Sequence, residues 1–423
     1  MFIIYDFVFL IFAVICLPVY FMRGKLSGAF SRRLGVLPEH LNLDRPIWIH
    51  AVSVGEVNAV KGLLLQLRQA YPGKKLVIST VTATGNKVAR EVIKEGDFLT
   101  YLPLDFSFIV RGVLKKINPC MFIIAETEIW PNLISCLDKA GIPVITVNGR
   151  ISDRSYRGYR LIKLFIRPIL RKVSQFCVQT REDGRRLENL GVEAKKIRVT
   201  GNVKFDINLG VSDGLEAKVY RDKLLLGASG RLLVCGSTHP GEEELILDAY
   251  RKILPAFPDL KILIAPRHPE RRKEVCRVVE QKGFMPLLIS ALSGFCPSCV
   301  NNPVFILDTV GELFNYYRAA DIVFIGGSLV KKGGHNIIEP ASLKKPVIFG
   351  PYMFNFRQIS ELFLANQAAL AVSGSGELSE RVKELLQGSL LAKGLAERAY
   401  ALILKNQGAT RKNIEIIKEI TKT

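Results

Sequence analysis

The chain has 423 residues, 48% of them hydrophobic, which is enough to bury two or three packed domains and argues against a disordered protein. Lys and Arg total 59 against 39 Asp and Glu, and the formal net charge of +20 points to anionic partners: nucleic acid, phospholipid headgroups or a phosphorylated substrate. Most of the eight cysteines lie in apolar runs, as expected of free thiols in a reducing compartment. Cys296 and Cys299 have the spacing of half a zinc site or a redox pair, but no second pair or nearby His accompanies them, so neither a metal nor a cofactor is expected.

The N-terminal segment carries the clearest targeting signal. Residues 1–22 are almost entirely apolar, broken only by Asp6 and Pro18, and basic residues begin at Arg23 and Lys25. The segment is long enough to span a bilayer or to lie embedded in one leaflet. Because the positive charges follow the apolar run, it predicts an uncleaved anchor in the inner (cytoplasmic) membrane, with the rest of the chain facing the cytosol. The alternative is a buried first helix of a globular domain.

After this segment, short runs rich in Val and Ile alternate with amphipathic stretches of helical length. The run at 46–52 precedes a helical pattern over 56–70, and the same unit recurs with apolar runs at 76–80, 121–125 and 142–147. A basic helical stretch, 155–172, follows the last of these. The alternation predicts right-handed βαβ crossovers and a parallel sheet with helices on both faces.

A polar, Gly-containing stretch, 206–230, interrupts the rhythm, which restarts with apolar runs at 231–236, 261–266, 304–307, 321–327 and 346–350. We therefore expect two doubly wound α/β domains that face each other across a cleft. We place the anchor at 1–22, the first α/β domain at 23–208 and the second at 209–423, and we expect the last helix to return to the first domain.

Carboxylates follow two strands of the first half. Glu56 comes after the run 46–52 through a turn of small residues, and Glu126 and Glu128 directly follow the run 121–125. Ligands of open α/β sheets bind beyond the carboxyl ends of the strands, where a carboxylate could act as a general base. Acidic residues also favour first helical turns for electrostatic reasons alone, so that alternative stays open.

In the second half, Ser237 and Thr238 lie in a turn between a strand and a helix that starts with Glu242, Glu243 and Glu244. Small residues let backbone N–H groups approach an anion, but the acidic run argues against a phosphate at the helix start, which leaves capping as an alternative role for the two hydroxyls.

The densest cluster of small and basic residues is 326–340, which contains four glycines, two lysines and His335 between a strand and a helix. Such a loop could form a nest for phosphate. Asn336 and Glu339 also have capping-box spacing. The loop is not a Walker motif, and no Gly-x-Gly-x-x-Gly fingerprint occurs, which argues against an ATPase or a dehydrogenase.

Seven segments in order carry a further signal: 50–56 (HAVSVGE), 125–132 (AETEIWPN), 148–155 (NGRISDRS), 201–206 (GNVKFD), 236–242 (GSTHPGE), 266–271 (PRHPER) and the loop 326–340. Together they resemble the Kdo transferase family, 3-deoxy-D-manno-octulosonic acid transferases of the GT-B fold, across nearly the whole chain.

The resemblance implies an inverting glycosyltransferase that moves Kdo from CMP-Kdo to a tetraacyl lipid A precursor, lipid IVA, in lipopolysaccharide core biosynthesis. It implies that Glu56 is the general base and that Glu126 and Lys204 stabilise the transition state. It places the CMP moiety on Pro266, Arg267, Gly311, Glu312, Leu313, Asn336, Ile337, Ile338 and Glu339. From the residues themselves, Ser237, Thr238, Gly333, Gly334 and His335 are added as a phosphate and donor loop.

A phosphorylated lipid acceptor in an anionic membrane would explain the excess of basic residues. Exposed lysines and arginines near an anionic leaflet each contribute about 1 kcal/mol of attraction, and the expected membrane-facing patch consists of Arg154, Arg157, Arg160, Lys163 and Arg167. One alternative function is a membrane-associated GT-B transferase with another nucleotide sugar and lipid acceptor. A second, a membrane-tethered nucleic-acid-binding protein, lacks the interleaved basic and aromatic residues of RNA modules, so no nucleic-acid partner is expected.

Overall fold

The computed structural model describes residues 5–7, 9–11, 14, 30–207, 214–227, 230–292 and 303–422. It divides into two compact units, unit 1 with residues 1–206 and 406–423, and unit 2 with residues 207–405. Most of the expected anchor, together with Cys296 and Cys299, lies outside the described residues. Within the described ranges, no helix combines the length and the hydropathy that crossing a membrane requires.

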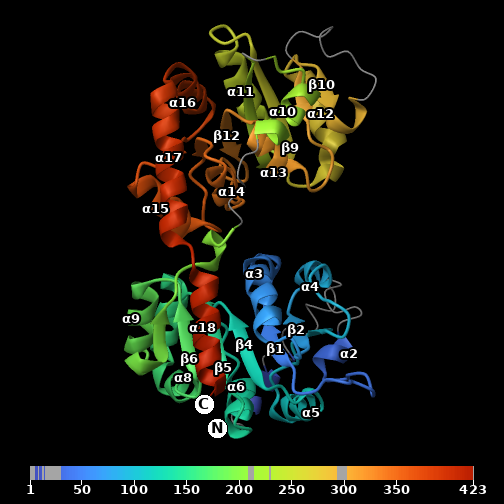
Figure 1. Ribbon diagram of the computed structural model, residues 1–423, viewed down its shortest axis with the longest axis vertical. Helices are drawn as coiled ribbons and strands as arrows, with labels where there is room; N and C mark the ends of the chain where they lie inside the picture. The colour runs from blue at the N-terminus through green and yellow to red at the C-terminus, as the bar shows by residue number, and fades with distance from the viewer. Residues whose placement is uncertain are drawn as a thin grey trace. The chain divides into compact units, whose positions relative to one another are not determined.

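Unit 1 is built on a seven-stranded parallel sheet in the order β3-β2-β1-β4-β5-β6-β7 (Figure 1). The strands are β1 (Ile47–His50), β2 (Leu76–Thr80), β3 (Phe98–Tyr101), β4 (Met121–Ala125), β5 (Val144–Gly149), β6 (Gln175–Val178) and β7 (Ile197–Val199). The first strand lies in the middle of the sheet, and the chain winds outward from it in both directions, so the predicted doubly wound topology is confirmed for this unit.

Helices cover both faces of this sheet. They are α2 (Phe30–Arg33), α3 (Val54–Ala70), α4 (Ala83–Arg90), α5 (Ser107–Ile117), α6 (Pro131–Lys139), α7 (Asp153–Leu161), α8 (Lys163–Leu170), α9 (Arg181–Asn189) and α18 (Ala409–Lys422). Because side chains alternate along a strand, Trp48 of β1 joins the apolar core under α5, α6 and α8, whereas Ile47 and Ile49 join the core under α3 and α18.

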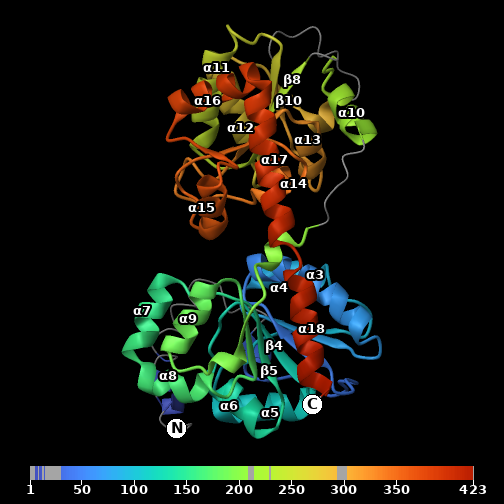
Figure 2. The ribbon, with the colours of Figure 1, turned by 60° about the vertical axis from the view of Figure 1, so that its left-hand side comes forward.

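The last helix, α18, belongs to unit 1 although unit 2 separates it from the rest of that unit in the sequence. It packs against α3 (Figure 2), and Ile414 and Ile417 bury its apolar face in the core under that helix. Asp206 accepts hydrogen bonds from the backbone N–H groups of Gly408, at 2.6 Å, and of Thr410. The start of α18 is therefore held by the residue that ends the first stretch of unit 1.

Unit 2 repeats the architecture with a second seven-stranded parallel sheet in the order β10-β11-β9-β8-β12-β13-β14. Its strands are β8 (Arg231–Thr238), β9 (Leu260–Pro266), β10 (Pro286–Leu288), β11 (Val304–Ile306), β12 (Ile322–Ile325), β13 (Val347–Phe349) and β14 (Leu370–Ala371). Its helices are α10 (Gly214–Lys223), α11 (Glu242–Ile253), α12 (Arg272–Gln281), α13 (Leu313–Ala319), α14 (Ile338–Ser342), α15 (Arg357–Ala365), α16 (Ser375–Gln387) and α17 (Ser389–Asn406).

Several elements were not expected from the sequence. The strands β3, β6, β7, β10 and β14, of two to four residues each, were not predicted. The interrupting stretch 206–230 contains a helix, α10. The single basic helix expected at 155–172 is two helices, α7 and α8, that meet at Ile162.

Candidate active site

The topological switch point of unit 1 lies between β1 and β4, which are hydrogen-bonded neighbours and from which the chain winds to opposite sides. The residues that follow the carboxyl ends of these two strands therefore lie together at the same edge of the sheet. Glu56 lies in the first turn of α3, directly after β1, and Glu126 and Glu128 directly follow β4. Glu56 follows one strand and the other two carboxylates follow another, yet all three are neighbours in the structure, since Glu126 and Glu128 both act electrostatically on Glu56.

Two hydrogen bonds orient the Glu56 carboxylate. The backbone N–H of Val52 donates to Oε2 at 2.7 Å, and the Ser53 hydroxyl donates to Oε1 at 3.2 Å. Both donors belong to the short turn between β1 and α3, and the carboxylate folds back onto it. The turn of small residues thus fixes the position of the side chain that follows it.

Burial raises the pKa of Glu56 to about 7, against the hydrogen bond from Val52, and the Glu126 and Glu128 carboxylates add to the rise. Burial also raises the pKa of Glu128, with a further contribution from Glu126. A carboxylate with a pKa near neutrality can accept a proton from a reacting hydroxyl far more effectively than an ordinary Glu, while it is still largely ionised at slightly alkaline pH.

Glu126 has a left-handed backbone conformation, with a φ of 58°. Such a conformation is uncommon for a residue with a side chain and is often found at functional sites. It allows the chain to leave β4 sharply, and Thr127, which follows, accepts a hydrogen bond from the backbone N–H of Arg150 at 3.0 Å. The ends of β4 and β5 are joined in this way.

Lys204 reaches the same carboxylates from a different part of the chain. It lies in the one-turn 3-10 helix Val203–Phe205, which is held on β5 because the backbone N–H of Val203 donates to Asn148 Oδ1 at 3.2 Å. Burial lowers the pKa of Lys204, whereas Glu126 and Glu56 oppose that shift. The structure therefore brings the three residues named as catalytic, Glu56, Glu126 and Lys204, into one electrostatic cluster.

In unit 2, the residues expected to bind CMP follow the carboxyl ends of three strands. Pro266 ends β9 and is buried, and Arg267 follows it exposed. Asn336 donates from Nδ2 to Glu339 Oε1 at 3.0 Å and accepts from the backbone N–H of Ile338 at 3.1 Å. Burial raises the pKa of Glu339, and Asn336 and Arg267 oppose that shift, so Arg267 lies close to this carboxylate.

The remaining residues of the expected CMP site fall into two groups. Gly311 is exposed with a φ of 91°, Glu312 precedes α13, and Leu313 opens that helix after β11. The Thr309 hydroxyl donates to Glu312 Oε2, which orients the carboxylate. Ile337 and Ile338 are fully buried, and the backbone N–H of Ile338 is engaged by Asn336 Oδ1.

The loop 326–340 differs from the open phosphate nest that its glycines suggested. The Glu242 carboxylate, fully buried, accepts hydrogen bonds from the backbone N–H groups of Gly327 at 2.5 Å, Ser328 at 2.9 Å and Leu329 at 2.8 Å. The N–H of Gly334 donates to the Gly327 carbonyl at 2.8 Å. These four N–H groups are engaged within the protein, so a phosphate bound at this loop would have to contact other groups.

The glycines of this loop serve close packing. A Cβ atom on Gly334 would come within 2.1 Å of Met353 Sδ, and one on Gly333 within 2.4 Å of Asn355, and both glycines have positive φ angles. Thr238 is buried and donates to Glu243 Oε1 at 2.9 Å, and Gly241 caps α11, so Thr238 does not have the capping role that the sequence left open. Ser237 is partly exposed with a φ of 60°.

Cationic side chains, among them Lys332 and Arg267, surround a pair of histidines at this loop. His239, after β8, and His335 lie with their Nε2 atoms 2.9 Å apart and their rings nearly parallel. Burial lowers the pKa of His239 to about 4, with Lys332 next in effect, and burial together with His239 lowers the pKa of His335 to about 4. The pair is therefore neutral at pH 7 within a cationic environment that would favour an anion.

Sequence reasoning missed three residues of these sites: Arg150, Glu242 and His239. Arg150 acts on Lys204 and, within the described part of the chain, its buried Nε has no hydrogen-bond partner. Its place directly after β5 is the signal that could have identified it, by the strand-end rule that identified Glu56. Glu242 gave no such signal, because a carboxylate bound by a distant loop cannot be recognised from local sequence.

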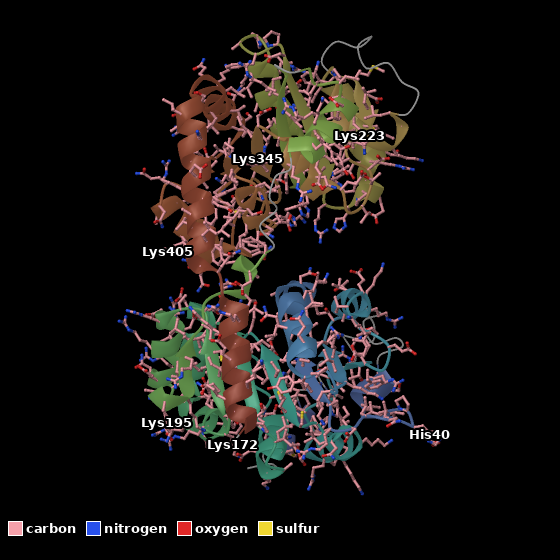
Figure 3. The ribbon with its side chains drawn as sticks, in the orientation of Figure 1. His40, Lys172, Lys195, Lys223, Lys345 and Lys405 are labelled. Atoms are coloured by element: carbon pink, nitrogen blue, oxygen red, sulfur yellow. The ribbon has the colours of Figure 1, made fainter. Side chains whose placement is uncertain are left out.

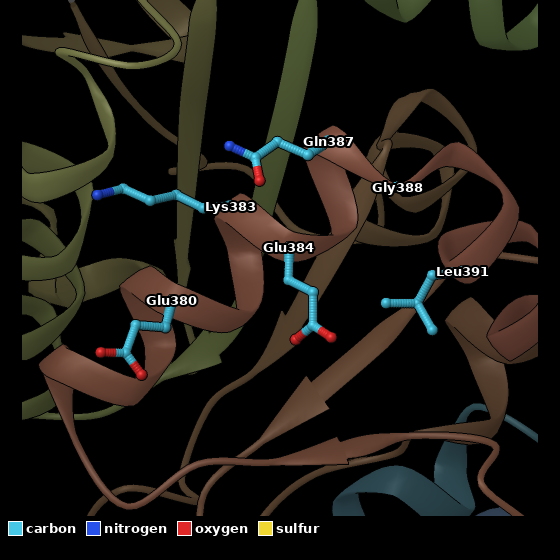
Figure 4. Close-up of a pocket in the computed structure, with 6 residues that line it drawn as sticks. All are labelled: Glu380, Lys383, Glu384, Gln387, Gly388 and Leu391. Atoms are coloured by element: carbon cyan, nitrogen blue, oxygen red, sulfur yellow. The ribbon is translucent and has the colours of Figure 1, made fainter.

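An open depression elsewhere in unit 2 is lined by Glu380, Lys383, Glu384, Gln387, Gly388 and Leu391, at the junction of α16 and α17 (Figure 4). None of these residues follows the carboxyl end of a strand. Side chains of both charges and one leucine line it, without a buried ionisable group. We therefore do not consider this depression a candidate active site.

Comparison with known proteins places the chain among transferases. A family model described as 3-deoxy-D-manno-octulosonic-acid transferase (kdotransferase) matches residues 28–207. A 3-deoxy-D-manno-octulosonic acid transferase of Haemophilus influenzae is 36% identical over 373 residues, which cover 88% of this chain and 86% of that protein. The enzyme of the same name from Bordetella pertussis is 32% identical, over 89% of this chain and 88% of that protein.

Among solved structures, a glycosyltransferase of Rickettsia africae aligns with a TM-score of 0.60 over 90% of this chain and 100% of that one, at 17% identity. Likeness at that level of identity concerns the fold alone. With the two parallel sheets described above, it confirms the predicted α/β class with the GT-B fold.

Proposed function

The chain belongs to the 3-deoxy-D-manno-octulosonic acid (Kdo) transferase family and is a Kdo-transferring glycosyltransferase, and on that premise we propose that it moves Kdo from CMP-Kdo to a tetraacyl lipid A precursor with inversion at the anomeric carbon. The observation that carries the mechanism is Glu56, whose pKa of about 7 and two orienting hydrogen bonds suit a general base.

In the proposed step, a sugar hydroxyl of the acceptor attacks the anomeric carbon of Kdo and gives its proton to a Glu56 carboxylate oxygen. The new oxygen–carbon bond forms as the bond to the CMP phosphate breaks, and the electron pair leaves with CMP. Lys204, close to Glu126 and Glu56, supplies positive charge beside the reacting groups, which stabilises the transition state electrostatically. No metal or cofactor takes part in this proposal.

The donor is assigned to unit 2. Arg267 and the Asn336–Glu339 turn lie beyond the strand ends, where a nucleotide is expected in a doubly wound domain. With the N–H groups of the 327–329 loop bound to Glu242, we assign the negative charges of the donor to Arg267 and Lys332, and the neutral His239–His335 pair can contribute hydrogen bonds. This replaces the backbone nest by side-chain cations.

The proposed place of action is the cytosolic side of the inner membrane, where a lipid acceptor and anionic phospholipids are available. Support comes from the apolar segment 1–22, the net charge of +20 and the exposed basic residues of α7 and α8, among them Arg154, Arg157 and Arg160.

The test is a transfer assay read by mass spectrometry, with the purified chain, CMP-Kdo generated in place and the tetraacyl lipid A precursor. The proposal expects mass gains of whole Kdo units. A folded protein that gives no gain with this pair, but transfers from a UDP-sugar, would favour the alternative of a related transferase with another donor.

The pH dependence of kcat/KM provides a prediction about Glu56. The base acts as a carboxylate, so kcat/KM is expected to rise with pH through about 7 and to be lost below it. In Glu128→Gln, one of the two negative charges that raise the pKa is removed, so the midpoint moves to lower pH. Profiles between about pH 5 and 9 measure this. An unmoved midpoint would contradict the electrostatic coupling.

Replacement of Arg267 by Ala is expected to raise the KM for CMP-Kdo about ten- to a hundredfold, because a charge-assisted hydrogen bond contributes about 1.5–3 kcal/mol. Arg277→Ala, which removes an exposed arginine of α12, is the matched control and leaves KM unchanged. Equal KM values for the two variants would remove Arg267 from the donor site.

A further inference from the structure

The described residues near the N-terminus are seated on unit 1 by an acidic residue. Residues 5–7, 9–11 and 14 are helical. Asp6 accepts hydrogen bonds through Oδ1 from the backbone N–H of Ser107, at 3.0 Å, and from Asn132 Nδ2, at 2.6 Å, and through Oδ2 from the Ser107 hydroxyl, at 2.6 Å. The only acidic residue in an otherwise apolar segment thus binds the first turns of α5 and α6.

Aromatic contacts extend this seat on both sides of Asp6. The Tyr5 ring stacks on Phe165 of α8 with centroids 6.1 Å apart, and the Phe9 ring meets the edge of Phe106 at 4.9 Å. Tyr5 also hydrogen-bonds Asp105, a buried carboxylate that accepts from the backbone N–H groups of Asn132 and Leu133. Residues 5, 6 and 9 therefore face the protein.

The other side of the same segment faces outward. Phe7, Leu10, Ile11 and Val14 have the i, i+3, i+4, i+7 spacing of one helix face, and all four are exposed, Phe7 and Val14 by 63%. The seat fixes which face is presented, because rotation of the segment would break the Asp6 hydrogen bonds. A contiguous apolar helix face that is exposed in this way marks a surface that binds another molecule or a membrane.

The neighbouring elements expose large apolar residues as well. Phe108 of α5, which stacks on Phe106, is 66% exposed, and Leu164 of α8, next to Phe165, is 93% exposed. We define the seated surface as Phe7, Leu10, Ile11, Val14, Phe108 and Leu164. The described residues 5–7 and 9–11, dark blue in Figure 2, lie beside α8, and α7, none of whose residues is buried, adjoins α8.

Charge decides between the possible partners of this surface. Arg160 and Lys163 are exposed on α7 and α8, and Arg111 is exposed on α5. Lys172, labelled in Figure 3, follows α8 but is partly buried and donates to the Ser135 hydroxyl at 2.9 Å, so it is not counted among these exposed cations. A second copy of a chain with a net charge of +20 would oppose like charges, whereas an anionic bilayer offers both acyl chains and negative headgroups.

We propose that Asp6 locks the N-terminal segment onto unit 1, so that the seated surface enters an anionic lipid bilayer as one unit in a fixed orientation. The inference deepens the proposed function, because it names the surface through which the enzyme meets its lipid partner. Asp6 is a positioning residue in this proposal. It aligns unit 1 with the membrane and takes no part in the chemistry.

The test uses tryptophan quenching by brominated lipids in vesicles that contain anionic phospholipid. Full-length Leu164→Trp is expected to be quenched at least about threefold more than Leu390→Trp, whose site is 85% exposed on α17 of unit 2. Equal quenching of the two variants while the protein is bound to vesicles would overturn the proposal, as would a stable dimer in the absence of lipid that hides Leu164.

The seat itself is tested by Asp6→Ala in the Leu164→Trp background. Vesicle binding is retained, because the segment becomes more apolar, but the quenching of the introduced tryptophan falls to about the level of the Leu390→Trp control. Ser107→Ala, which removes one of the donors to Asp6, gives a partial loss and covers the case in which Asp6→Ala does not fold. Unchanged quenching in both variants would show that no lock exists.

The outcome is separable from that of the transfer assay. With a detergent-solubilised acceptor, transfer does not require a vesicle. Transfer without quenching would overturn the seated surface alone, and quenching without transfer would overturn the proposed function alone.

Discussion

Glu56→Gln is expected to lower kcat by about 10³-fold, within the 10²–10⁴ range that a positioned general base contributes. The amide keeps the volume of the side chain, and its oxygen can still accept from the Val52 N–H that binds Oε2 at 2.7 Å. What it loses is the ability to take a proton. The loss should therefore appear in kcat with little change in the KM for CMP-Kdo, measured by mass-spectrometric transfer under saturating acceptor.

Two further readouts make this prediction specific. The residual activity of Glu56→Gln should no longer rise as pH passes about 7, because the titrating group is gone. Glu91→Gln, which removes an exposed carboxylate 3.9 Å from Lys61 in the same unit, is the matched control and keeps full activity. Turnover of Glu56→Gln within about threefold of the wild type would exclude Glu56 as the base.

The second large effect concerns stability and falls on Glu242. Burial raises the pKa of this carboxyl, and four backbone N–H groups, those of His239, Gly327, Ser328 and Leu329, oppose that shift. In Glu242→Gln an amide N–H₂ would replace one acceptor oxygen and face donors. Loss of a partner from a buried charged network costs about 3–5 kcal/mol, so the free energy of unfolding of unit 2 should fall by about that amount.

Urea unfolding followed by circular dichroism measures this loss, and Glu280→Gln, an exposed residue of α12, should change the unfolding free energy by less than about 0.5 kcal/mol. Glu242→Gln also tests the donor site, since a loosened 326–340 loop should raise the KM for CMP-Kdo. If Glu242→Gln unfolds with the wild-type free energy, the Glu242 carboxylate is not what holds the loop.

The residues of the catalytic cluster were identified in two different ways, by their position after a strand and by the family resemblance. Glu56 and Glu126 could be selected from the sequence because each directly follows an apolar run, and the carboxyl ends of neighbouring parallel strands converge. Lys204 could not be selected in that way. It is one of 59 Lys and Arg residues, and only the family resemblance indicated it.

The loop 326–340 shows what glycine content leaves open. Its composition suggested a phosphate nest, and in the structure Glu242, more than 80 residues earlier, occupies the N–H groups of Gly327 to Leu329. Gly333 and Gly334 are required because Asn355 and Met353 pack against their Cα atoms. Glycine content indicates that a backbone is closely approached, and it does not indicate by what.

The sequence by itself determined the α/β class, the repeated strand–helix units and the strand ends at which chemistry is placed, because these depend on local periodicity and on the geometry of parallel sheets. Only the tertiary structure decided that Lys204 joins Glu56 and Glu126, that Glu242 fills the loop of unit 2 and that Asp6 seats the N-terminal segment on Ser107 and Asn132. Each of these contacts joins residues about 80 or more positions apart. Such pairings depend on how whole elements pack, and no local pattern of residue types encodes them.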